Sequence, residues 1–159
     1  MPSLSSGNFL TTNGTSLSWS ALSAQAGLRS IQVWTSNGTW SRPSGVKTIS
    51  VTVTGAGGGG SGFTEAGGAG GTSKRVIDVT NTSSVSVTIG NPGGGTNYSG
   101  CGGNGNTSSF GSYCSASGGY GANCRQGRAG GVGGNGSGGN LNVYGGGGNG
   151  YGSFHSYGN

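Results

Sequence analysis

Alternating hydrophobic and polar positions are concentrated in the middle third of the chain. Between residues 48 and 54 every second side chain is apolar, and the residues between them are serine or threonine. Because successive side chains of a strand point to opposite faces, this pattern predicts a half-buried strand over 46–54. Its predicted apolar face consists of Ile49, Val51 and Val53.

Further strands are predicted on both sides of this one. Ile31 and Val33 alternate into Asn37-Gly38, a dipeptide typical of a tight hairpin turn between arms that end at Trp34 and Trp40. Two later strands are predicted over 74–79 and around Val85, Val87 and Ile89, the last closed by Gly90-Asn91-Pro92. In strand 74–79, Val76 and Ile77 are adjacent, so the pattern does not decide which face of this strand points inward. A second turn is predicted at Arg42-Pro43 with Gly45.

These elements predict an all-β protein. Four or five short strands with serine and threonine on their outer faces favour a small antiparallel β-sandwich or sheet over residues 31–90. A single layer with so few large side chains is marginally stable by itself, so self-association would help to bury it. Residues 1–30 are interpreted as an N-terminal arm and residues 91–159 as a glycine-rich distal region.

Glycine makes up 42 of the 159 residues, and 26 of them follow residue 90. Two structures fit such segments, a flexible coil or an array of polyglycine II helices with three residues per turn. Ordering glycine is entropically costly, so an array is plausible only if nearly every backbone group finds a partner. The aromatic residues that punctuate this region favour the ordered structure, because a plain linker does not need them.

The arm over residues 1–30 is rich in serine, threonine and asparagine with scattered apolar residues. Either it is a flexible leader, or it is an extended arm that orders when its apolar side chains dock on a larger assembly. Ser20 could cap a short helical turn over 21–26. The candidate docking residues are Leu4, Phe9, Leu10, Leu17, Trp19 and Leu22.

Composition narrows the class of protein. Leucine, isoleucine, valine and phenylalanine together number 24, a low content, but the formal net charge is only +5, which weakens the case for disorder. The basic residues are dispersed, so nucleic acid is not an expected partner. The N-terminus lacks the pattern of a signal peptide and no apolar run is long enough to span a membrane, so synthesis in a cytoplasm without export by the usual route is expected.

Residues with catalytic or metal-binding chemistry are scarce. Glu65 and Asp78 are the only carboxylates and His155 the only imidazole. General acid–base catalysis needs a positioned titratable pair, so no enzyme activity is expected, and both carboxylates are interpreted as solvated charges, with Lys74 or Arg75 as a partner of Asp78. Residues 55–60 match G-x-G-x-x-G, but no helix-forming residues follow, so no nucleotide cofactor is expected.

The three cysteines, Cys101, Cys114 and Cys124, contain no Cys-x-x-Cys pair. Free thiols that fill small spaces are favoured over one disulfide, and no metal site is expected. The chain therefore offers mainly a surface of aromatic, amide and hydroxyl groups. Such groups suit carbohydrate, with rings over sugar faces and asparagine and serine on hydroxyls, unless the rings only fill gaps between glycine helices.

Three stretches of the chain resemble the glycine-rich domain of bacteriophage tail fibre and tail-tip proteins. They read TSNGTWSRPSGVKTISVTVTGAGGGGSG, GGAGGTSKRVIDVTNTSSVSVTIGNPGGG and GCGGNGNTSSFGSYCSASGGYGAN, and the resemblance covers about residues 34–159. The leader GNFLTTNGTSLSWSAL is similar to phrases in tail fibres of phages that infect cyanobacteria. The short leader departs from the family, whose fibres usually have a longer virion-binding region.

The resemblance implies a virion protein made in the bacterial cytoplasm, a tail fibre or adhesin that contacts the host surface, usually as a homotrimer. It implies that the arm anchors the chain to other virion proteins and that distal loops bind a host polysaccharide or an outer-membrane protein. The alternative is a capsid decoration or head-fibre protein that only stabilises the particle. The candidate receptor-binding residues are Tyr144, Tyr151, Phe154, His155 and Tyr157.

Overall fold

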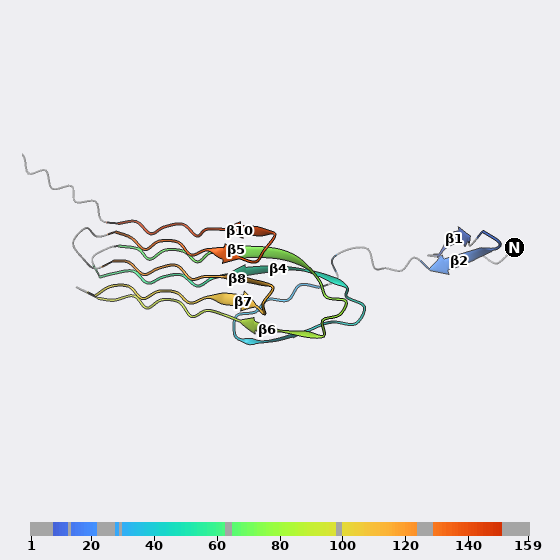
Figure 1. Cartoon of the computed structure of the whole chain (residues 1–159), viewed down its shortest axis with the longest axis horizontal. Coiled ribbons are helices and arrows are strands. Elements are labelled where there is room, and N and C mark those ends of the chain that lie inside the picture. The colour runs from blue at the N-terminus through green and yellow to red at the C-terminus, as the bar shows by residue number, and fades with distance from the viewer. Residues whose placement is uncertain are drawn as a thin grey trace, which may run out of the picture. The chain divides into compact units, whose positions relative to one another are not determined.

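The computed structural model of the chain describes residues 8–12, 14–21, 28, 30–62, 65–97, 100–123 and 129–150. The chain divides into two compact units, Met1–Val33 and Trp34–Asn159, which are considered separately (Figure 1). The described residues form strands and extended segments without a helix, so the all-β prediction is confirmed. None of these residues therefore belongs to a helix that could cross a membrane.

The first unit contains a β-hairpin. Strands β1 (Asn8–Thr12) and β2 (Leu17–Ala21) pair antiparallel, with Leu10 opposite Trp19. Gly14 lies in the connecting turn with a positive φ of 92°, a conformation that glycine adopts without strain. The prediction of an extended arm is therefore corrected for residues 8–21. Ala21, the first residue of the predicted helical turn, ends β2, and residues 22–27 lie outside the described residues.

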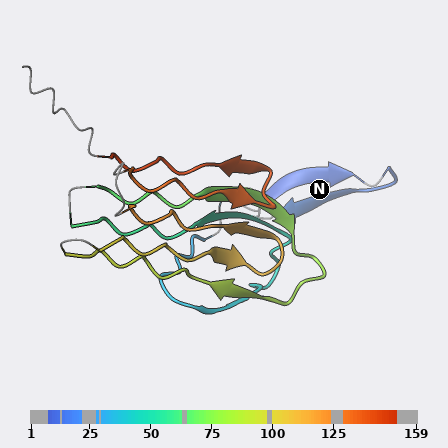
Figure 2. The same ribbon diagram turned by 60° about the vertical axis from the view of Figure 1, so that its left-hand side comes forward.

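The second unit begins with a sandwich of two antiparallel sheets (Figures 1 and 2). One sheet has the order β10-β5-β4, and the other has the order β3-β6-β7-β8-β9. The strands are β3 (Gly38–Ser41), β4 (Thr48–Thr54), β5 (Thr72–Asp78), β6 (Ser84–Thr88), β7 (Ser108–Phe110), β8 (Cys114–Ala116), β9 (Gly136–Ser137) and β10 (Leu141–Val143). Strands β7 to β10 come from the glycine-rich region, which therefore completes both sheets.

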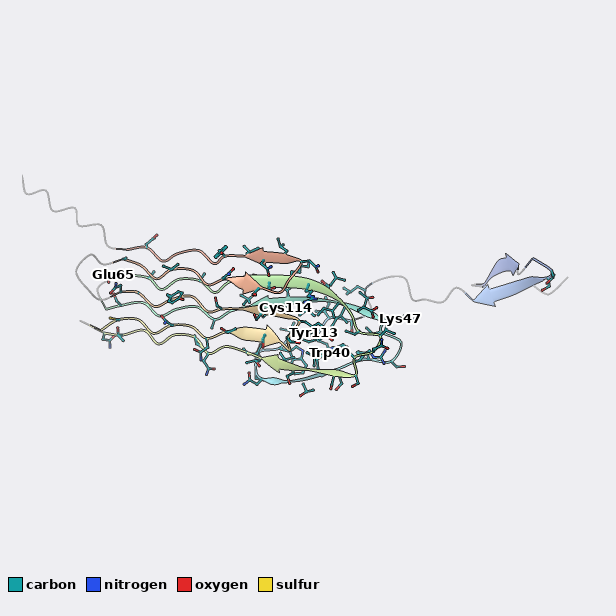
Figure 3. All side chains as sticks on the ribbon, in the orientation of Figure 1. Trp40, Lys47, Glu65, Tyr113 and Cys114 are labelled. Carbon is teal, nitrogen blue, oxygen red and sulfur yellow. The ribbon has the colours of Figure 1, made fainter. Side chains whose placement is uncertain are left out.

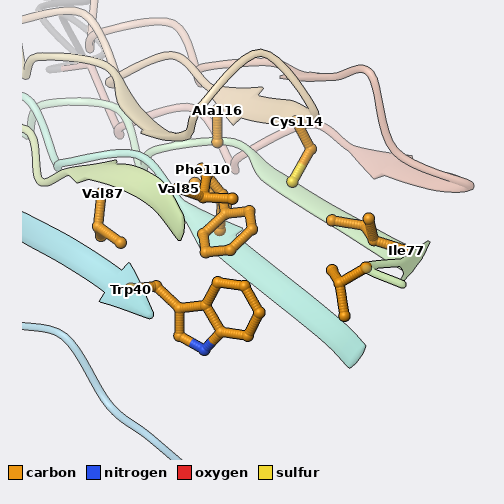
Figure 4. Close-up of a cluster of buried hydrophobic side chains, with 9 residues drawn as sticks. Trp40, Ile77, Val85, Val87, Phe110, Cys114 and Ala116 are labelled. Carbon is orange, nitrogen blue, oxygen red and sulfur yellow. The ribbon is translucent and has the colours of Figure 1, made fainter. Parts of the chain in front are cut away.

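A small hydrophobic core lies between the two sheets (Figure 4). Trp40 is 6% exposed, and its ring meets the ring of Phe110 edge to face, with centroids 5.8 Å apart. Buried aliphatic side chains surround the two rings. They come from both sheets and include Val53, Ile77, Val85, Val87 and Ala116. The guanidinium of Arg75 lies over the ring of Tyr113 and donates to the carbonyls of Tyr113 and Gly138, which links the two sheets.

The predicted faces of the strands agree with the structure. Val53 is buried and the neighbouring threonines of β4 are exposed, as the alternation requires. The ambiguity in β5 is resolved, because Ile77 points into the core and Val76 is 58% exposed. The turn at residues 43–46 is also confirmed: the Val46 amide donates to the Pro43 carbonyl, and Gly45 has a φ of 75°, as a type II turn requires.

The predicted hairpin at Asn37-Gly38 is wrong. β3 begins at Gly38 and pairs with β6, and residues 31–37 form no strand. Instead, the Asn37 side-chain oxygen accepts a hydrogen bond from the Ile89 amide, which ties it to the chain beyond β6. The ring of Trp34 occupies the place where a side chain on residue 38 would lie, so glycine is required there for packing and not for a turn. Long-range pairing has overridden the local turn preference.

Seven glycine-rich segments extend the sandwich, each a direct continuation of a strand (Figure 1). We name them segments A to G in chain order. A (55–60) follows β4, and B (65–71) leads into β5. C (90–97) follows β6, and D (100–107) leads into β7. E (117–123) follows β8, F (129–135) leads into β9, and G (144–150) follows β10.

Backbone hydrogen bonds join these segments with a repeat of three residues. The amides of Gly55 and Gly58 donate to segment B, and those of Ala56 and Gly59 donate to segment D. The carbonyls of Gly57 and Gly60 accept from segment C. A partner that recurs every third residue is the signature of polyglycine II, which has three residues per turn. The ordered structure considered for the glycine-rich region is therefore the one observed.

The same bonds arrange the seven segments in two layers. C, A, B and G lie side by side in one layer, and D, E and F lie in the grooves of the other. Segments A, B and E are bonded to one another, as when Gly58 donates to Gly68, Gly68 to Tyr120, and Gly119 to Ala56 at 2.8 to 2.9 Å. We call this two-layered body the slab. Its backbone groups replace the side chains that hold an ordinary core.

Candidate functional site

The glycine-rich segments run side by side from the sandwich and end together (Figures 1 and 2). Ser61 bonds to Glu65 between A and B, Thr96 bonds to Gly100 between C and D, and Asn123 bonds to Ala129 between E and F. Ala66 donates to Asn149 near the end of G. The described segments therefore all have an end at the same side of the slab, which we call the distal end. The sandwich lies at the other end.

Glu65 lies in the slab at the distal end (Figure 3). Its side chain is only 2% exposed, and its carboxylate accepts a hydrogen bond from the Ser61 hydroxyl. The Ser61 amide donates to the Glu65 carbonyl at 2.9 Å. The prediction of a solvated loop charge at Glu65 is therefore wrong. The carboxylate ties the two ends of the A–B connection together, and the closeness of Ser61 in the chain was the sequence signal for this contact.

Asp78 is exposed, as predicted, but its partner is different. Its carboxylate accepts from the Thr80 backbone amide at 2.8 Å, within the turn after β5. The Thr80 hydroxyl and then that amide hold the pKa of the Asp78 carboxyl below its ordinary value. Glu65 and Asp78 therefore lie at opposite ends of the second unit. In the described part of the chain, no cluster of three histidine, cysteine or acidic side chains could hold a metal ion.

The cysteines differ from the prediction in part. Cys114 is a free thiol, 3% exposed in the core, as predicted. Cys101, in contrast, is disulfide-bonded and lies on segment D near the distal end. Cys124 lies outside the described residues. Burial raises the pKa of the Cys114 thiol, which the neighbouring Arg75 guanidinium partly opposes.

We expect alkylation to distinguish these cysteines. Since Cys114 is buried and its pKa is raised, the native chain should take up no iodoacetamide near neutral pH. After denaturation without a reductant, one thiol per chain should react, and it should be Cys114. Mass spectrometry of tryptic peptides checks both points. Rapid labelling of Cys114 in the native protein would contradict its placement, and the Cys114→Ser variant should show no labelling in either state.

The slab has two faces of different character. On the face of segments D, E and F, side chains recur every third residue: Cys101, Asn104 and Thr107 on D, Ser117, Tyr120 and Asn123 on E, and Ala129, Val132 and Asn135 on F. Two of them bond the backbone of a neighbouring segment. The Asn104 side-chain oxygen accepts from the Gly121 amide, and the Ser117 hydroxyl oxygen accepts from the Asn135 amide. We call this the capped face.

The opposite face, formed by the layer that contains segments A and B, is almost bare. Its rows are Thr54, Gly57 and Gly60 on A, and Ala66, Ala69 and Thr72 on B. A methyl group added at Gly57 would have its nearest neighbour 4.0 Å away, so this position faces open space. Figure 3 shows how few side chains the slab carries compared with the sandwich. We call this the open face.

The predicted receptor-binding residues are only partly described. Tyr144 is 74% exposed, but it directly follows β10 and begins segment G, at the end of that segment next to the sandwich and not at the distal end. Tyr151, Phe154, His155 and Tyr157 lie outside the described residues, as do Leu4 and Leu22 of the arm. The structure places Phe9 and Leu10 in β1, and Leu17 and Trp19 in β2.

The rings of the glycine-rich region do not fill gaps between glycine segments where they are described. Phe110 and Tyr113 belong to the sandwich, whereas Tyr120 is 56% exposed on the capped face. The sequence interpretation missed Tyr120, Asn104 and Ser117 as surface residues. A spacing of three, as in residues 117, 120 and 123, was the available signal, but it can be interpreted only once the segments are known to be polyglycine II.

Residues 33–159 match the model of a protein family described as a glycine-rich domain. The match covers the whole sandwich and slab. No curated protein and no solved structure matches the chain.

Proposed function

The chain belongs to the glycine-rich domain family, and on that premise we propose that it is a structural protein of a bacteriophage particle, a tail fibre or adhesin that contacts the bacterial surface. The proposed role is binding without catalysis. Its ligand would be a surface polysaccharide or an outer-membrane protein of the host.

The observation that carries this proposal is that the described segments, which continue into the connections and into residues 151–159, all end together at one end of the slab. Binding residues are disproportionately found on loops that a rigid scaffold positions. The slab supplies such a scaffold, because each of its central segments is bonded to four neighbours. Sequence can then vary at the distal end without disturbing the backbone bonds. The proposed receptor-binding residues that follow segment G are Tyr151, Phe154, His155 and Tyr157.

The proposed attachment to the particle is through the N-terminal arm. Leu28, Ile31 and Val33 are 75 to 82% exposed, which supports docking of this part of the chain on another protein. Ile31 and Val33 had been predicted in a strand, where such side chains would be partly covered. The anchoring residues proposed with them are Leu4, Phe9, Leu10, Leu17, Trp19 and Leu22. Self-association, which the family resemblance implies as a trimer, is considered separately below.

Binding of the full-length chain to bacteria and to immobilised envelope polysaccharides tests the proposal. A variant with Tyr151→Ala, Phe154→Ala, His155→Ala and Tyr157→Ala should bind roughly tenfold more weakly or worse, because aromatic anchors dominate binding energies. Tyr120→Ala, on the capped face, is the matched control and should bind as the unchanged chain does. Absence of binding to any cell or polysaccharide would contradict the proposal, as would an equal loss in both variants.

Location on the particle separates this function from capsid decoration. Antibody to the chain, labelled with gold, should mark the tail of intact particles. Labelling of the capsid shell would instead support a decoration or head-fibre protein.

A further inference from the structure

We propose that the open face of the slab binds the open face of a second copy of this chain, so that two slabs stack as a two-fold symmetric pair. This inference does not depend on the proposed function, because it concerns the purified chain alone. It rests on which backbone amides have an acceptor on each face and on which side chains each face carries.

On the open face, backbone amides are left over at every third position. Within the described residues, the amides of Gly57 and Gly60 on segment A donate to no protein group, and neither do those of Gly67 and Gly70 on segment B. Their neighbours in the same segments all donate within the slab, as Gly58 does to Gly68 and Ala69 does to Gly146. The leftover amides therefore point away from the slab, in rows with the repeat of polyglycine II.

On the capped face, side chains of the chain itself accept two of the outward amides, whereas within the described residues those of Gly118 and Val132 donate to no protein group. Asn104 accepts from the Gly121 amide at 2.9 Å, and Ser117 accepts from the Asn135 amide at 2.7 Å. Tyr120 and Val132 also protrude there and would hold another slab at a distance. The chain thus covers one face with protruding side chains and leaves the other bare enough for a further layer.

The open face admits only a partner with an equally bare backbone. Within the slab, segments approach so closely that a methyl group at Gly55, Gly58 or Gly68 would fall inside van der Waals contact of a carbonyl oxygen in the other layer. Only segments that present glycine at those contacts can stack in this way. A second copy provides such segments. Because segments A and B run antiparallel, a segment of the second copy can lie beside a parallel or an antiparallel neighbour. Such a self-complementary contact closes as a two-fold pair.

Apolar side chains continue the open face onto the sandwich. Val76 on β5 is 58% exposed, and Leu141 and Val143 on β10 are 57% and 46% exposed. Leu141 pairs with Lys74 and Val143 with Thr72, so these side chains share the side of the sheet that Thr72 extends into segment B. Burial of these groups would add a hydrophobic contribution to the backbone bonds. The charged residues of β5 on this side, Lys74 and Asp78, have opposite signs and do not oppose pairing.

The mass of the full-length chain in solution, followed by sedimentation over a wide range of concentration, tests the inference. We expect the purified protein to sediment as a dimer. Ala69→Arg places a long cation at the centre of the open face and should weaken the pair roughly a hundredfold. Val132→Arg is the matched control, because Val132 is 68% exposed on the capped face, and it should leave the pair intact.

Exchange of individual amide protons provides a second measurement, which stands even if Ala69→Arg fails to fold. In the pair, the amides of Gly57, Gly60, Gly67 and Gly70 should exchange as slowly as we expect for the bonded amides of Gly58 and Gly68. Rapid exchange of these four amides at concentrations where the pair persists would overturn the inference. A single copy at all concentrations, a trimer, or a pair that Val132→Arg disrupts and Ala69→Arg does not, would also overturn it.

Discussion

Replacement of Gly68 by alanine is expected to destabilise the protein by about 3 to 5 kcal/mol. Gly68 lies where segments B, E and F meet, and the added methyl group would fall inside van der Waals contact of the Val132 carbonyl oxygen. Overpacking of a close-packed interior costs roughly 1 to 3 kcal/mol. Separation of the layers would also weaken the bonds from Gly68 to Tyr120 and from Gly131 to Ala66, each with a net value of about 0.5 to 1.5 kcal/mol.

The matched control for Gly68→Ala is Gly94→Ala. Gly94 belongs to segment C, has no heavy atom within 4 Å of the added methyl group and has no positive φ. Alanine there should stabilise the protein by about 0.4 to 1 kcal/mol, because it restricts the unfolded chain. The midpoints of urea unfolding measure both variants. If the two substitutions had the same effect, close packing would not be what makes glycine necessary in the slab.

Trp40→Ala is expected to lower the free energy of unfolding by about 3 to 5 kcal/mol, the usual range for removal of a large buried aromatic side chain. Trp40 is nearly fully buried, packs against Phe110 and lies on β3 at the edge of the five-stranded sheet. Its loss leaves a cavity that the few other large side chains of this core cannot fill. Since natural domains are stable by only about 5 to 15 kcal/mol, much of the margin would be lost.

Urea unfolding followed by circular dichroism measures this change, and Tyr120→Ala is the control. Tyr120 is exposed on the capped face, so its truncation should change stability by no more than about 0.5 kcal/mol. A loss below about 1 kcal/mol for Trp40→Ala would show that the backbone bonds of the slab, and not the sandwich core, hold the second unit together.

The strands with alternating side chains were predictable because burial of one face leaves a mark at every second residue. β4, β5 and β6 were predicted within two residues of their observed ends, and Val53, Val85 and Val87 are buried as their positions in the alternation require. The sequence also correctly limited the glycine-rich region to two structures, a coil or an ordered array in which nearly every backbone amide and carbonyl has a partner. Strands β7 to β10 were missed, because strands of only two or three residues are too short for an alternation to be recognised.

Other features depend on contacts between residues far apart in the chain. Asn37 bonds to Ile89 and not across a local turn, and Glu65 is buried although its sequence surroundings are those of a solvated loop. The two layers, and the contrast between the capped and open faces, follow from which glycine segment lies beside which. Glycine segments are nearly identical in side-chain content, so their neighbours are chosen by the strands that they continue. The amino-acid pattern thus specifies the strands and the need for complete backbone pairing, whereas the fold alone assigns the partners, because a backbone hydrogen bond carries no residue identity.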